Sequence, residues 1–181
     1  MYKIIKKEDT FESKWSGGTT RELYIYPENS KYLEKNFNFR ISIAITENEE
    51  STFTKLEGVD RIISIIQGKM EIFHDGHYNK ILLPYEIDRF RGEWNTTSKG
   101  KVTDFNLMSK GCKGDFFFRE IKDTEVLKFK EIELFMFVYC IEGNITIDNK
   151  LIIDDELIII RNNQITVCSE MAKIFYGYIK I

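Results

Sequence analysis

Apolar and polar residues alternate along most of the chain. In the segment FNFRISIAI (37–45), five apolar side chains fall on one strand face, opposite Asn38, Arg40, Ser42 and Ala44. Similar short segments recur, separated by turn sequences such as QGK, HDGH, EGN and IDNK. The predicted strands are RIISIIQ, KMEIF, KILL, KVTDFNLM, ELFMFVYCI, NITID, KLIID, ELIIIR, QITVC and KIFYGYIKI. SKYLEKNF (30–37) is a candidate for a short helix or turn. The pattern predicts an all-β sandwich or barrel.

The strand pattern occurs twice. SIIQGKMEIF (64–73) is followed by an Asn-Lys pair and two further strands, and YCIEGNITI (139–147) is followed by the same order of features. Gly68 matches Gly143 in this comparison. Chance similarity between apolar strands is the alternative explanation. We interpret the match as a duplicated barrel, with one cupin-like unit in residues 1–110 and a second in 111–181, packed as one globular body.

Composition narrows the classes of partner. The chain has 181 residues and a net charge of −3, with basic residues spread along it. We therefore expect no nucleic acid and no membrane as partner. No apolar run reaches the roughly 20 residues of a membrane helix, and the N-terminus has no signal-peptide core, so a cytoplasmic location is expected. Three widely spaced cysteines predict reduced thiols rather than a disulfide framework.

The sequence offers little for metal or nucleophilic chemistry. Its two histidines, His74 and His77, flank an Asp-Gly pair, and we interpret both as polar residues at a solvated hairpin turn. A metal site needs three or four converging ligands. No nucleophile elbow, phosphate-binding loop or histidine-based triad is present. We predict no metal site, no cofactor and no catalytic residue of these kinds.

Polar residues on otherwise apolar strands are the remaining candidates for a site. By the spacing i, i+2, Arg40 shares a strand face with Ser42, and Asp104 shares one with Asn106. The predicted ligand-binding residues are Thr20, Glu22, Arg40, Ser42, Arg61, Asp104 and Asn106. Arginine binds a carboxylate through parallel hydrogen bonds, so these faces would suit a small polar anion. A purely structural network of ion pairs between β-layers is the equal alternative.

Several segments carry a resemblance to a known family. GGTTREL, FRISIAI, FTKLEGVDRIISIIQG and DFNLM resemble the HutD/Ves family in order and spacing over residues 10–110. The resemblance implies a bicupin of double-stranded β-helix type in a bacterial cytosol. It further implies binding of a small intermediate of histidine utilisation, such as urocanate or formylglutamate, with a regulatory or accessory role. Trp15 lies closer to the glycines than in the family pattern.

Three hypotheses about function follow. The leading one is a non-enzymatic protein that binds a small anionic metabolite. The second is a small-molecule lyase or isomerase in which Glu22 or Asp104 acts as general base. The third is an interaction module that forms a homodimer through its strands.

Overall fold

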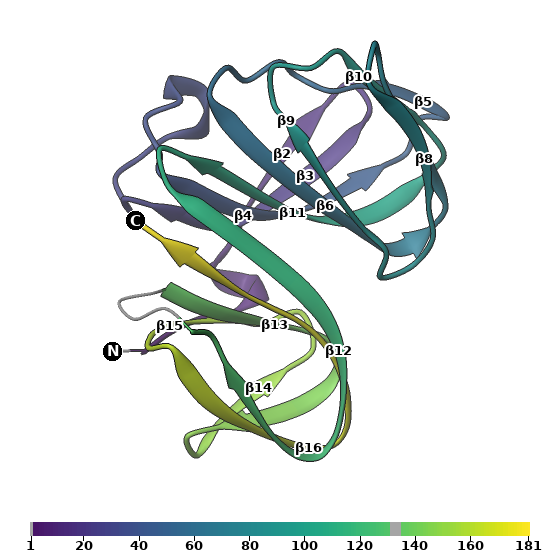
Figure 1. Cartoon of the computed structure of the whole chain (residues 1–181). Coiled ribbons are helices and arrows are strands. Elements are labelled where there is room, and N and C mark those ends of the chain that lie inside the picture. The colour runs from purple at the N-terminus through teal and green to yellow at the C-terminus, as the bar shows by residue number, and fades with distance from the viewer. Residues whose placement is uncertain (1, 131–134) are drawn as a thin grey trace. The chain divides into compact units, whose positions relative to one another are not determined.

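The computed structural model describes residues 2–130 and 135–181 (Figure 1). Contacts divide the chain into two compact units, an N-terminal unit (Phe11–Cys112) and a C-terminal unit (Met1–Thr10 with Lys113–Ile181). The division differs from the sequence expectation in the first ten residues. The apolar strand β1 (Tyr2–Ile5) pairs antiparallel with β15 (Leu157–Arg161), so it extends a sheet of the C-terminal unit.

Two sheets build the N-terminal unit. The first has the order β2-β3-β4-β11-β6-β9 and the second the order β5-β10-β7-β8. Their bounds are β2 (Phe11–Trp15), β3 (Gly18–Tyr26), β4 (Phe39–Thr46), β5 (Glu50–Thr52), β6 (Val59–Gly68), β7 (Met70–His74), β8 (Tyr78–Leu82), β9 (Ile87–Arg91), β10 (Thr96–Lys99) and β11 (Val102–Lys110). An apolar cluster joins Ile63, Ile65 and Phe90 of the first sheet to Met70 and Ile72 of the second. The inner face of each sheet is therefore the one that carries these residues.

The C-terminal unit has longer strands, and among the described residues they form a single connected sheet. Its sheet runs β1-β15-β13-β16-β12, and β14 pairs with β13. The bounds are β12 (Lys113–Lys128), β13 (Phe135–Ile147), β14 (Lys150–Ile153), β15 and β16 (Gln164–Lys180). Figure 1 shows β12 and β16 bending side by side along this unit. Short 3-10 turns lie at Lys7–Asp9 (η1) and Tyr32–Glu34 (η2), the latter inside the segment predicted to hold a helix or turn.

Strand pairing follows the same scheme in both units. In the N-terminal unit, β6 pairs with β9 and β11, while β7 pairs with β8 and β10. In the C-terminal unit, the single strand β13 makes all the equivalent pairings, with β15, β14 and β16. Each unit is thus a cupin-type jelly roll, and the chain is a bicupin.

The matching glycines occupy the same environment in both units. Gly68 and Gly143 have φ of +94° and +89°. A Cβ at Gly68 would lie 2.5 Å from the Lys101 carbonyl oxygen, and one at Gly143 would lie 2.6 Å from that of Met171. Only glycine fits such a backbone angle and so close an approach. The recurrence of this glycine in the sequence therefore has a steric cause.

A turn stabilised by a glutamate also recurs. The Glu86 carboxylate accepts a hydrogen bond from the Leu83 amide at 2.9 Å, and Glu156 accepts one from the Ile153 amide at 3.1 Å. The residue before each glutamate has positive φ, 70° at Tyr85 and 67° at Asp155. The two units therefore share individual contacts as well as topology.

Replacing Gly143 by alanine is expected to lower the free energy of unfolding by about 3 kcal/mol, because backbone must move to admit the methyl group. Urea denaturation measures this. Gly76→Ala is the matched control, since Gly76 has φ of +76° and a Cβ added there would meet no atom within 4 Å. The backbone cost of about 1 kcal/mol then remains. Equal losses in both variants would contradict the steric explanation.

Some elements differ from the sequence prediction. The sequence pattern does not predict a strand over 113–128, yet β12 is 16 residues long, with a register shift between Ile121 and Asp123. QITVC and KIFYGYIKI belong to one strand, β16. Residues 133 and 134 of the predicted strand ELFMFVYCI lie outside the described residues. Within the described ranges, no helix is long and apolar enough to cross a membrane.

Candidate functional site

Strand register places the predicted site residues on one face of the first N-terminal sheet. Glu22 on β3 is opposite Ser42 on β4, which is opposite Asn106 on β11. Directly opposed residues point to the same side of a sheet, and so do residues two apart on one strand. Thr20, Arg40 and Asp104 therefore share that face. Met108 on β11 lies opposite Arg40 on β4 and also opposite Arg61 on β6. The Arg61 side chain therefore points to the same face.

This shared surface, called here the polar face, is an inner face of the jelly roll. Arg61 lies two residues from Ile63, which belongs to the apolar cluster between the two sheets. Met108 belongs to a second apolar cluster with Ile25 and Phe37. The polar face therefore lies between two apolar clusters, an environment in which unpartnered charges are costly.

Arg40 is held by its neighbours. Its Nε donates to Glu22 Oε2 at 2.6 Å, and its Nη1 donates to Ser42 Oγ at 3.2 Å. The guanidinium also lies 4.4 Å from the centre of the Tyr32 ring. The Arg40 side chain is buried, whereas that of Glu22 is 30% exposed. Arg40 is therefore a satisfied and positioned cation.

Arg61 is buried with fewer partners. Its guanidinium lies 4.8 Å from the Phe53 ring and 5.2 Å from the Phe90 ring, and its Nη1 is 3.5 Å from the Thr54 carbonyl oxygen. Its Nε is buried and has no hydrogen-bond partner among the described residues. Burial lowers the pKa of Arg61 to about 10, while the charges of Tyr32 and Asp104 act in the opposite direction.

Asp104 and Asn106 form the third part of the polar face. Asn106 Nδ2 donates to Asp104 Oδ1, and both side chains are buried. The Asn106 Oδ1 atom has no hydrogen-bond donor among the described residues. Burial raises the pKa of Asp104 to about 7, although the Asn106 hydrogen bond and the Arg61 charge oppose the shift. Asp104 therefore changes its charge near neutral pH.

The hairpin between β2 and β3 carries the remaining residue, Thr20. Gly18 has φ of +154°, and its Cβ would lie 1.8 Å from the Ile45 carbonyl oxygen. Close packing against backbone therefore requires glycine at Gly18, whereas a Cβ at Gly17 would meet only the ring of Trp15. Thr20 is half-buried and lies at the hairpin end of β3. The structure thus places the seven predicted residues on one sheet face. Their hydrogen bonds form two groups, Glu22–Arg40–Ser42 and Asp104–Asn106, and Thr20 lies at the hairpin end.

Known proteins share both the sequence pattern and the fold of this chain. The model of the HutD family matches residues 7–175. The chain belongs to the HutD family. A relative described as an uncharacterised 21.2 kDa protein in the hutC 3′ region of Pseudomonas putida is 33% identical over 111 residues. That match covers 58% of this chain and 56% of the relative, so it spans about half the length of either protein.

Solved structures share the fold of this HutD-family chain. A conserved protein of unknown function, PA5104 from Pseudomonas aeruginosa, has a TM-score of 0.87 at 17% identity, with both chains fully covered. HutD from Pseudomonas fluorescens has a TM-score of 0.78 at 20% identity and 98% coverage of both chains. YhhW from Escherichia coli has 0.77 at 9% identity, covering 98% of this chain and 97% of YhhW. At sequence identities this low, the similarity shows a shared fold alone.

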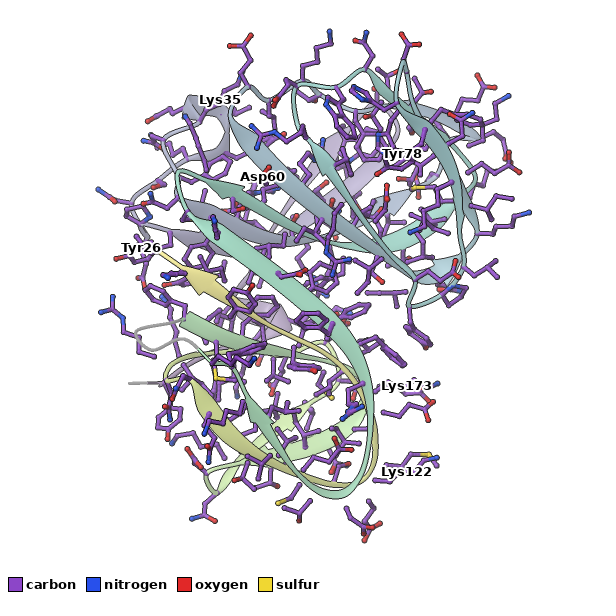
Figure 2. The ribbon with its side chains drawn as sticks, in the orientation of Figure 1. Tyr26, Lys35, Asp60, Tyr78, Lys122 and Lys173 are labelled. Carbon is purple, nitrogen blue, oxygen red and sulfur yellow. The ribbon has the colours of Figure 1, made fainter. Side chains whose placement is uncertain are left out.

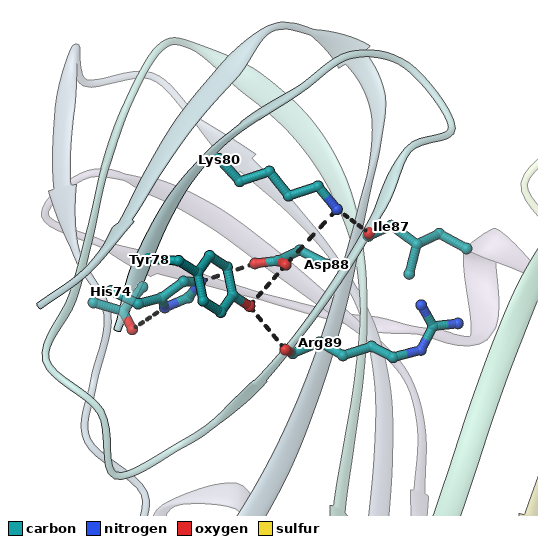
Figure 3. A network of polar contacts seen from close by, with 7 residues as sticks. His74, Tyr78, Lys80, Ile87, Asp88 and Arg89 are labelled. Atoms are coloured by element: carbon teal, nitrogen blue, oxygen red, sulfur yellow. Dashed lines mark hydrogen bonds and ion pairs between the residues drawn. The ribbon is translucent and has the colours of Figure 1, made fainter. Parts of the chain in front are cut away.

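The interpretation of both histidines as solvated turn residues is wrong for His74. The His74 side chain is buried, with Nδ1 at 2.8 Å from Thr96 Oγ1 and Nε2 at 2.8 Å from Asp88 Oδ2 (Figure 3). The Tyr78 hydroxyl donates to Asp88 Oδ1 at 2.9 Å. The position of Tyr78 among the strands of the N-terminal unit is marked in Figure 2. His77, by contrast, is exposed at the turn, where its ring centre lies 3.8 Å from that of Trp94.

A sequence signal for His74 exists. Met70, Ile72 and His74 alternate on β7, and the first two are core residues, so the same face carries the histidine. Its partners on β9 and β10 come from non-local pairing, which local patterns do not reveal. Among the described residues no group of three or more His, Cys, Asp or Glu side chains could hold a metal ion.

Replacing His74 by alanine is expected to lower the free energy of unfolding by about 3 kcal/mol, because Asp88 and Thr96 lose their buried partner. Chemical denaturation monitored by Trp fluorescence measures the loss. His77→Ala removes an exposed ring of the same type and is expected to cost about 1 kcal/mol or less. A His74 variant as stable as the His77 variant would show that the network contributes little.

A surface pocket in the C-terminal unit is a weaker candidate. It is lined by Asp123, Thr124, Asn144, Thr146, Cys168, Ser169, Glu170 and Met171. None of these described side chains is a buried polar group without a partner. The polar face of the N-terminal unit is therefore the candidate site.

Proposed function

We propose that this HutD-family chain binds a small carboxylate-bearing metabolite on the polar face of its N-terminal unit, in a regulatory or accessory role. The observation that carries the proposal is the buried Arg61 Nε, a charged donor with no hydrogen-bond partner among the described residues. Buried donors without partners are rare, and a buried charge is costly unless paired. A ligand carboxylate would supply the missing acceptor after the side chains that cover the buried Nε have moved aside.

The same geometry limits the ligand further. Asn106 Oδ1 is a buried acceptor without a donor among the described residues, and Asn106 lies two residues from Asp104 on the same strand face. A ligand that satisfies both Arg61 and Asn106 carries a carboxylate and an N–H or O–H group. Urocanate has a ring N–H and formylglutamate has an amide N–H, so both have the required groups.

The genetic position of the Pseudomonas putida relative supports these two compounds. That protein is described by its place in the hutC 3′ region. We extend a histidine-utilisation context to this chain on the basis of family membership, and we choose the test ligands accordingly.

A thermal-shift titration tests the proposal. Urocanate and N-formylglutamate are added to the chain separately, with the methyl ester of urocanate as a control that lacks the anion. A ligand at 100 times its dissociation constant adds about 2.7 kcal/mol to stability. We expect a shift of the melting midpoint with at least one acid and none with the ester. An unchanged midpoint with both acids would contradict the proposal.

One observation favours a second candidate function, catalysis by a carboxylate general base. Asp104 has a pKa of about 7 through burial, which is suited to proton transfer near neutral pH. Glu22 is less suited because its carboxylate is committed to Arg40. If the chain is a lyase or isomerase, ¹H NMR will show turnover of urocanate that Asp104→Asn abolishes. Binding without turnover supports the first function instead.

A further inference from the structure

The polar face holds two buried cations and two carboxylates. Arg40 and Glu22 form a close ion pair, whereas Arg61 and Asp104 are both more than nine-tenths buried and form no ion pair with any described residue. At neutral pH the four charges sum to zero when Asp104 is ionised. A bound carboxylate would add a negative charge to this apolar environment, and such a charge is costly unless it is compensated.

We propose that Asp104 takes up a proton when a carboxylate ligand binds at Arg61, so that ligand affinity is linked to pH. The inference rests on the proposed function and adds its regulation. The carboxyl group of Asp104 becomes neutral as the ligand carboxylate takes the anionic place beside Arg61. The site then has the same net charge with and without ligand.

The geometry selects Asp104 rather than Glu22 as the proton acceptor. Glu22 Oε2 is 2.6 Å from Arg40 Nε, and its side chain is 30% exposed, so its carboxylate already has a cationic partner and contact with solvent. Asp104 is 3% exposed, and the partner that donates to it is a neutral amide, Asn106. Burial already brings its pKa to about 7. A second anion close by raises a carboxyl pKa further.

Other titratable groups on this face do not replace Asp104. They are Glu22 on β3, Tyr32 at η2, Arg40 on β4 and Arg61 on β6, with His74 and Asp88 beyond Phe90. His74 and Asp88 are hydrogen-bonded to each other, which separates their network from the unpartnered Arg61 Nε. Arginines stay charged near neutral pH. Asp104 is therefore the group whose protonation responds to the ligand.

Isothermal titration calorimetry of the whole chain tests the inference. N-formylglutamate and urocanate are titrated at pH 6 to 8.5 in pairs of buffers with different ionisation enthalpies. At pH 8 we expect uptake of close to one proton per ligand bound, and a dissociation constant that rises up to about tenfold per pH unit above 7. The Asp104→Asn variant should show neither effect. Because protonation of the ligand itself contributes equally with both proteins, the Asp104→Asn titration also serves to subtract that contribution.

The outcomes are distinguishable. Binding without proton uptake, or the same uptake in Asp104→Asn, would overturn the proton linkage and leave the proposed function standing. Absence of binding heat for both compounds at every pH would overturn the proposed function and the linkage together. A circular dichroism melt confirms that the variant is folded before it is titrated.

Discussion

Replacing Arg61 by glutamine is expected to weaken binding of the carboxylate ligand by about a hundredfold. Arg61 offers a desolvated, charged donor to the ligand, and removal of one partner from a buried charged pair costs about 2–5 kcal/mol. Calorimetry at pH 6.5 measures the change in dissociation constant. The control is Arg91→Gln, because Arg91 forms exposed ion pairs with Asp60 and Glu93 and should leave affinity unaltered. Wild-type affinity in the Arg61 variant would contradict the site.

The stability of the same variant separates a binding site from a structural network. If Arg61 only stabilises the packing of the two sheets, its replacement should lower the free energy of unfolding by about 3–5 kcal/mol. If Arg61 is instead part of a ligand site, Arg61→Gln removes a buried charge that is only partly satisfied without ligand. The free energy of unfolding of the unliganded chain should then fall little or even rise. Urea denaturation of Arg61→Gln without ligand decides between these alternatives, which the sequence alone does not separate.

Replacing Asp104 by asparagine is expected to remove a large pH dependence of stability. The pKa of Asp104 rises from 3.8 to about 7 on folding, so the folded state binds more protons than the unfolded state between these values. Wild-type stability therefore falls as pH rises from about 4 to 7, by at most about 4 kcal/mol from this group. Asparagine resembles the neutral acid and does not titrate.

The measurement is a series of urea denaturations of wild type and Asp104→Asn from pH 4 to 8. We expect the free energy of unfolding of Asp104→Asn, relative to that of wild type, to increase steadily as pH rises from 4 and to level off above pH 7. Glu71→Gln is a suitable control, because that carboxylate lies on the surface near Lys69. Parallel curves for wild type and Asp104→Asn would show that Asp104 keeps an ordinary pKa.

Alternation along the strands made much of the polar face predictable. Arg40 and Ser42, and likewise Asp104 and Asn106, are two residues apart on uninterrupted strands, so their common orientation follows from the backbone period. The repeated glycine was visible because the same steric requirement acts on Gly68 and Gly143. The first feature arises from the backbone period alone, and the second also requires close approach to the carbonyl oxygens of Lys101 and Met171 on neighbouring segments.

The features that escaped prediction depend on distant pairing or irregular strands. β1 pairs with β15, which lies near the opposite end of the sequence, and no local pattern reveals that partner. β12 carries many charged residues and a register shift, which interrupts the alternation that identifies a strand. His74 follows the apolar alternation of β7, but the adjacent Asp-Gly turn made it look exposed. The unpartnered Arg61 Nε is a tertiary property with no sequence signature.

The most direct test of the ligand site is a crystal structure of the chain soaked with urocanate. We expect a ligand carboxylate oxygen within about 3 Å of Arg61 Nε, with the ring N–H directed at Asn106 Oδ1. Urocanate bound elsewhere on the chain, with Arg61 Nε unchanged, would contradict the proposed site.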